Sequence, residues 1–151
     1  MEYQAVANGA EKEYALGMTA LAVDDTLTAL ACLERALKLQ DNPGWHSCLG
    51  YCIARERGQQ RRGLELCLSA LAVEQDNPVH YLNLGRVHLI SGDKMEALRV
   101  LREGMAKGGS PEIVRLLETL GTRKPSLFPM LHRDNPLNKY LGLFLSRLGL
   151  R

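Results

Sequence analysis

The chain has 151 residues, enough for one well-buried domain, and its hydrophobic fraction of 46% and charged fraction of 24% are ordinary globular values. No apolar run approaches the roughly 20 residues that span a bilayer, and the N-terminus lacks a secretory pattern, so we expect a soluble, cytoplasmic protein. The net charge of +2 hides an asymmetry. Residues 1–50 are acidic overall, whereas residues 119–151 contain six basic side chains and a single acidic one, Asp134.

Helices account for every element that we expect. Apolar residues recur at spacings of three and four, and no stretch alternates as a strand does. Residues 1–9 are expected to be frayed or only partly helical. Two helices should follow over about 10–23 and 26–39, because the Asp-Asp-Thr sequence at 24–26 supplies a turn and an N-cap.

Four further helices form two more pairs. They are expected over about 43–57, 60–73, 78–90 and 94–107. Pro43 and Pro78 start the first helix of each pair, because proline is well tolerated in a first helical turn. Gly58 and Gly92 mark the turns between the two helices of each pair, since glycine readily adopts turn conformations.

These helix pairs follow an internal repeat. The sequence Gln-Asp-Asn-Pro at 40–43 recurs at 75–78, and a Leu-Gly pair stands at 16–17, 49–50 and 84–85. Steps of 33 to 35 residues at several independent positions indicate a helical solenoid. In such a fold each helix pair buries its apolar face against its neighbours.

The third copy resembles a tetratricopeptide repeat (TPR), whose signature is a large aromatic residue, Leu-Gly, a second aromatic, small residues and a terminal proline. The matching residues are Tyr81, Leu84, Gly85, His88, Ala97, Leu101 and Gly104. The second copy holds His46, Leu49, Gly50, Ile53, Gly63, Cys67 and Ala70, and the first holds Glu13, Leu16, Gly17, Ala20, Ala29, Leu33 and Ala36. The resemblance implies an all-α fold, a right-handed α-solenoid of three helix-turn-helix repeats.

We expect residues 1–122 to form this solenoid and residues 123–151 to form a basic tail. The repeats would cover about 10–42, 43–77 and 78–110, with a capping helix over 111–121 that covers the last exposed face. The tail contains Pro125 and Pro129 and then an amphipathic helix that begins at Pro136. This helix can pack on the solenoid or stay free to dock elsewhere, and we favour packing.

The sequence contains few candidates for catalytic or metal-binding residues. No glycine-rich phosphate loop and no Gly-x-Ser-x-Gly or His-Glu-x-x-His motif occurs, so we expect neither an enzyme nor a bound cofactor. Cys48 and Cys52 lie four residues apart, and Cys32 and Cys67 fall on neighbouring expected helices, so a cluster of thiols is geometrically possible. Because all four coincide with apolar stripes, we favour core packing over a metal site.

In TPR proteins the first helices of successive repeats line a concave groove that holds a peptide or a partner helix. Mapped through the Leu-Gly pairs, the resemblance implies a partner-binding groove of Tyr14, Met18, Ser47, Tyr51, Arg55, Leu82, Arg86 and Leu89. One TPR subclass holds a C-terminal carboxylate with Lys and Asn in the groove. Here Tyr14, Met18 and Leu82 stand at those places, so that clamp is not expected.

The function that follows is non-catalytic protein–protein recognition, as a scaffold, adaptor or chaperone. Arg55 and Arg86 are expected to select an acidic feature of a protein or peptide partner. We expect no nucleic-acid partner. The alternative is a membrane-peripheral or partner-docking module that acts through the basic C-terminal helix, whose basic groups would favour anionic lipid.

Overall fold

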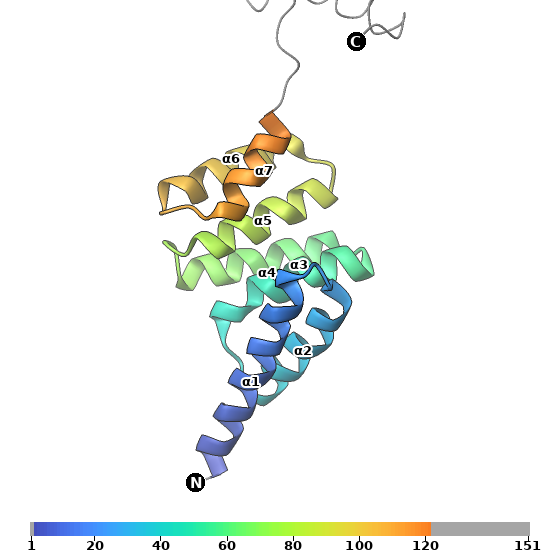
Figure 1. Ribbon diagram of the computed structural model, residues 1–151, viewed down its shortest axis with the longest axis vertical. Helices are drawn as coiled ribbons and strands as arrows, with labels where there is room; N and C mark the ends of the chain where they lie inside the picture. Colours follow the sequence, from blue (N-terminus) through green and yellow to red (C-terminus); the bar gives the residue numbers. More distant parts are fainter. Residues whose placement is uncertain (1, 122–151) are drawn as a thin grey trace, which may run out of the picture. The chain divides into compact units, whose positions relative to one another are not determined.

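The computed structural model describes residues 2–121, and every regular element among them is a helix (Figure 1). The helices are α1 (Glu2–Ala22), α2 (Thr26–Leu39), the 3₁₀ helix η1 (Pro43–Trp45), α3 (His46–Arg57), α4 (Gln60–Val73), α5 (Pro78–Ile90), α6 (Lys94–Ala106) and α7 (Pro111–Gly121). They belong to one compact unit that ends at Leu120. The predictions for the tail, residues 123–151, lie outside the described residues.

Three helix pairs, α1/α2, α3/α4 and α5/α6, stack one on the next, and α7 follows the last pair (Figure 1). The turn inside each pair contains a residue in the left-handed backbone region, with φ of 61° at Asp24, 64° at Gly58 and 81° at Gly92. Glycine adopts this conformation freely and aspartate tolerates it. The predicted α-solenoid of helical repeats is therefore confirmed.

Side-chain caps place most of the helix starts where the sequence predicted them. The carboxylates of Asp25 and Asp93 accept hydrogen bonds from the backbone N–H groups of Thr28 and Glu96, both at 3.1 Å. The Asn77 side chain accepts from the N–H of Val79, also at 3.1 Å. These bonds satisfy donors that a helix leaves unpaired in its first turn.

The N-terminal segment differs from the prediction. We expected residues 1–9 to be frayed or only partly helical, but α1 begins at Glu2. Ala10 is fully buried against Ala36 and Trp45, and Gly9 lies against Leu39 at the end of α2. Alanine is also the best helix former, so the first half of α1 has both a favourable propensity and a packing surface.

Small residues allow the helices of each pair to approach closely. A Cβ atom added to Gly50 would lie 2.6 Å from the carbonyl oxygen of Gly63, and one added to Gly63 would lie 2.7 Å from that of Gly50. The four cysteines are free and buried in the core, as expected from their positions in apolar stripes. Within residues 2–121, no helix is long and apolar enough to cross a membrane.

Candidate functional site

The eight predicted groove residues lie on α1, α3 and α5, the first helices of the three pairs, but their exposure differs. Ser47 is fully buried, and Tyr51 and Leu82 are only 6% and 7% exposed. Five residues keep solvent-accessible surface: Tyr14, Met18, Arg55, Arg86 and Leu89. We call the surface of these five residues the α1–α3–α5 face.

Tyr51 connects two arginines on this face. The guanidinium of Arg86 lies over the Tyr51 ring, with its central carbon 4.9 Å from the ring centroid. Arg55 donates a hydrogen bond of 2.7 Å from Nη1 to the Tyr51 hydroxyl. The same Arg55 binds the Asp24 carboxylate through both terminal nitrogens, at 3.0 and 3.1 Å. The ring is therefore held at its hydroxyl by one guanidinium and covered on its face by another.

Tyr14, on the same face, packs against a second aromatic ring that is largely buried. The Tyr14 ring stacks on that of Trp45, with centroids 4.6 Å apart and planes 10° from parallel. Burial raises the pKa of Tyr14 well above its usual value, and the nearby thiol of Cys48 raises it further. Cys48 itself contacts the Met18 sulfur at 3.7 Å. Trp45 lies outside the predicted set, although it is the single tryptophan of the chain.

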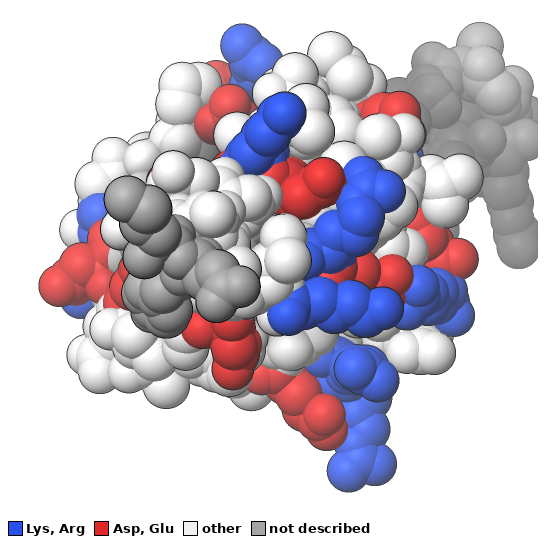
Figure 2. Space-filling model, turned by 90° about the horizontal axis from the view of Figure 1, so that it is seen from below, with Lys and Arg blue, Asp and Glu red and all other residues white. Residues whose placement is uncertain are grey.

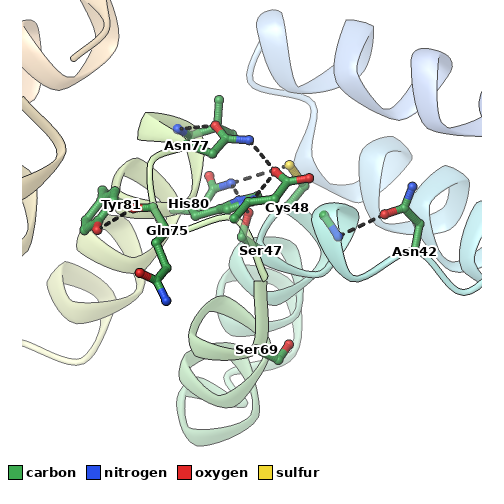
Figure 3. A network of polar contacts seen from close by, with 12 residues as sticks. Asn42, Ser47, Cys48, Ser69, Gln75, Asn77, His80 and Tyr81 are labelled. Carbon is green, nitrogen blue, oxygen red and sulfur yellow. Dashed lines mark hydrogen bonds and ion pairs between the residues drawn. The ribbon is translucent and has the colours of Figure 1, made fainter. Parts of the chain in front are cut away.

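Ser47 belongs to a buried hydrogen-bond network between α3 and α5 (Figure 3). Its hydroxyl lies 2.7 Å from Nδ1 of His80, and the other ring nitrogen of His80 lies 2.9 Å from Oε2 of Glu74. Asn83 donates from Nδ2 to the Ser47 oxygen at 3.2 Å and to the Cys48 sulfur at 3.5 Å. A neutral His80 with its proton on Nε2 satisfies the whole chain, since Ser47 then donates to Nδ1.

The order serine, histidine, carboxylate is also that of a hydrolase triad, but the burial of this network argues against a nucleophilic role. Ser47 has no exposed surface and His80 is 1% exposed. Because the Ser47 oxygen has no solvent-accessible surface, a substrate carbonyl has no route to it in this arrangement. The network instead ties the second helix pair to the third.

Sequence reasoning missed Glu74, His80 and Asn83. The signal was present in the spacing, because Ser47 is 33 residues from His80 and 36 from Asn83. These separations are close to one repeat length, so the two helices place such positions side by side. The carboxylate of Glu74 also accepts from Asn77 at 2.7 Å, and the bonds from Asn77 and His80 lower the pKa of Glu74.

The Leu82 side chain is buried where the last helices of the solenoid pack together, and it adds little to the accessible surface. It packs with Leu101 and Ile113, and with the partly buried leucines of α7. Within residues 2–121, no group of three or more His, Cys, Asp or Glu side chains is arranged to hold a metal ion.

Several basic side chains elsewhere are neutralised by ion pairs. Figure 2 shows Lys and Arg gathered on one side of the unit and interleaved with Asp and Glu. The α3–α4 turn contributes Arg55, Arg57, Arg61 and Arg62, next to an open hollow of about 580 Å³. Arg55 forms an ion pair with Asp24, Arg57 with Glu34 and Arg61 with Glu65. This turn offers fewer free charges than its composition suggests.

Comparisons with known proteins support the fold. No family model matches the chain, and no curated protein matches it in sequence. Among solved structures, the TPR domain of Sgt2 from Aspergillus fumigatus aligns with a TM-score of 0.58 and 19% identity, over 84% of this chain and 93% of that one. The N-terminal domain of stress-induced protein-1 (STI-1) from C. elegans aligns with a TM-score of 0.51 and 17% identity, over 78% and 98%.

The Sgt2 structure is a domain of the repeat that the sequence resembles. The identity of both similar structures to this chain is low, so the likeness concerns the arrangement of helices. Together with the stacked pairs, it confirms the resemblance stated from the residues. The chain has the fold of a tetratricopeptide-repeat domain.

Proposed function

We propose that the protein is a non-catalytic recognition module whose α1–α3–α5 face binds an extended peptide or a helix of another protein. The observation that supports this best is the composition of the accessible surface, to which α1 contributes Tyr14 and Met18, α3 contributes Arg55 and α5 contributes Arg86. Tyrosine and arginine are over-represented among residues that dominate binding energy, and methionine adapts to varied partners.

The fold supports the same proposal. Stacked helix pairs present their first helices one after another along one side, which suits a ligand that crosses several helices. The side chains on this side are already held by contacts between repeats, such as the stack of Tyr14 on Trp45 and the bonds from Arg55 to Asp24 and Tyr51. A face ordered before binding loses less conformational entropy when the partner arrives.

The test is affinity capture from the native host, with four baits: the full chain, two charge-reversed variants and a chain stopped at residue 122. Arg86→Glu alters the α1–α3–α5 face, and Arg62→Glu makes the same change on an exposed arginine of α4 for which no ion pair is found in residues 2–121. We expect a partner to be lost with Arg86→Glu and kept with Arg62→Glu. Thermal unfolding followed by circular dichroism should be nearly unchanged in both variants.

Two outcomes would contradict the proposal. A partner that both variants retain would not use this face. A partner that is lost only when the chain is stopped at residue 122 would assign the function to the tail. If Arg86→Glu unfolded the protein, the cation–π contact with Tyr51 would be structural and the milder Arg86→Gln would take its place.

A further inference from the structure

We propose that the partner presents the carboxylate of an Asp or Glu side chain to the guanidinium of Arg86, at the surface of the Tyr51 ring. This inference rests on the proposed function and adds the chemistry of the ligand. It also separates Arg86 from Arg55, which the sequence had treated as equivalent.

Arg86 has no anionic partner of its own in residues 2–121. It is partly buried, and its contact within this part of the chain is the face of the Tyr51 ring, with no ion pair or hydrogen bond to a carboxylate. Arg57 and Arg99, by contrast, are paired with Glu34 and with two glutamates of α6. A guanidinium that stacks on an aromatic ring keeps its in-plane N–H donors available, and these match a carboxylate in a bidentate arrangement.

Arg55 is committed to other groups. Both of its terminal nitrogens bind Asp24, and one of them also donates to the Tyr51 hydroxyl. A partner carboxylate would have to displace Asp24 to reach it. Arg55 therefore acts as a positioning residue that fixes the ring on which Arg86 lies, while Arg86 makes the contact with the ligand.

The groups around Arg86 leave its charge largely unbalanced. Cys48 and Cys52 lie close enough to feel the guanidinium, but burial raises the pKa of both thiols, that of Cys52 to about 12, so both are neutral at physiological pH. A carboxylate near Arg86 is that of Glu112, at the start of α7. Hydrogen bonds from its own backbone and from Ser110 lower the pKa of Glu112 most, and the charges of Arg115 and then Arg86 lower it further. Glu112 forms no ion pair with Arg86, so the guanidinium remains available to an outside anion.

The experiment uses a displayed library of random peptides, selected against the full chain. Peptides that bind are then resynthesised with each Asp or Glu replaced by Asn or Gln. Their affinities are measured through the fluorescence of Trp45, which stacks on Tyr14 in the α1–α3–α5 face. The protein variants are Arg86→Gln, Arg86→Lys and Arg55→Gln, with Met18→Lys as a variant that alters the face but leaves Arg86 in place.

We expect selected peptides to share one acidic position. Neutralising that position or introducing Arg86→Gln should each weaken binding about ten-fold, and the two changes together should cost little more than either alone. Arg86→Lys should recover only part of the loss, because lysine keeps the charge but cannot form the bidentate, stacked arrangement. Arg55→Gln should weaken binding less than Arg86→Gln and should leave the preference for an acidic residue intact.

The failures are distinguishable. Peptides that lose affinity with Met18→Lys but show no acidic preference, or additive losses with Arg86→Gln, would overturn the carboxylate inference and leave the recognition face standing. Peptides that bind every variant like the original chain, or a library that yields no binder, would contradict the proposed function itself. Circular dichroism of each variant shows that a loss of affinity is not a loss of fold.

Discussion

The two junctions between the three helix pairs are built differently. Where the first pair meets the second, the contacts include the stack of Tyr14 on Trp45, the sulfur contact of Met18 with Cys48, one hydrogen bond from Thr26 to Glu56 and ion pairs at the surface. Where the second pair meets the third, a polar network joins the buried Ser47 and His80 to the exposed carboxylate of Glu74. Aromatic and sulfur contacts tolerate small shifts, whereas buried hydrogen bonds demand fixed geometry.

One solenoid thus combines an adaptable junction with a rigid one. Tyr51 lies on α3, between the two, and it is held from one side by Arg55 and covered from the other by Arg86. The accessible face therefore depends on both junctions. Substitutions that act on one junction at a time show how much each contributes.

The largest effect is expected for His80→Ala. The change removes a ring that is 1% exposed and leaves the Ser47 hydroxyl without its partner, so we expect a loss of about 3 kcal/mol in the free energy of unfolding. Urea denaturation of both proteins measures it. The control is His88→Ala, a partly buried histidine of the same helix, for which we expect about 1 kcal/mol or less. Equal losses would mean that the network contributes nothing beyond packing.

A smaller loss is expected for Tyr14→Leu at the other junction. Leucine keeps an apolar contact but removes the ring that stacks on Trp45, so stability should fall by about 1 kcal/mol. Urea denaturation gives this value, and the emission of Trp45 should change in the folded protein because its neighbour is replaced. Unchanged tryptophan emission would argue against the stack.

Acid should weaken the rigid junction selectively. The pKa of Glu74 in the folded protein lies below its usual value of 4.5, because Asn77 and His80 donate hydrogen bonds to the ionised carboxylate. This contribution to stability is present above the unfolded pKa and is lost as the pH falls through the folded pKa. Wild type should therefore exceed Glu74→Gln in urea midpoint at neutral pH, and the gap should shrink below about pH 4.5. A gap that widened in acid would reverse the assigned sign.

The smallest effect is expected for Asp24→Asn, which removes the charge that Arg55 binds but keeps a residue type that tolerates the left-handed turn. Both partners are substantially exposed, so the change should cost at most about 0.5 kcal/mol. Thermal unfolding at low and high salt is the measurement, and the difference between the two proteins should decrease at high salt. A difference independent of salt would point to the turn rather than the charge.

Most of the helices could be predicted because their signals are local. The caps at Asp25, Asn77 and Asp93 act within three residues, and α2, α4 and α5 have the bounds that the sequence indicated. The extent of α1 could not be predicted in the same way. Its first half is held by Ala36, Trp45 and Leu39, which are distant in the sequence.

The candidate site was predicted only in part. The Leu-Gly register placed all eight residues on the first helices of the pairs, where they lie in the structure, but it could not separate exposed from buried positions. Leu82 is covered by α7, and Ser47 is covered because His80 and Asn83 occupy its side of α5. Burial of one side chain depends on the size and polarity of its neighbours, and these differ from one repeat to the next.

The sequence by itself determined the repeat, the helix pairs and their turns, because hydrophobic periodicity, proline, glycine and capping residues act over a few positions of the chain. Only the tertiary structure decided that Arg55 is bound to Asp24 while Arg86 is not paired in the described part of the chain. Both are arginines on first helices, and nothing local distinguishes them. The distinction arises because Asp24 is brought beside Arg55 when the first pair stacks on the second.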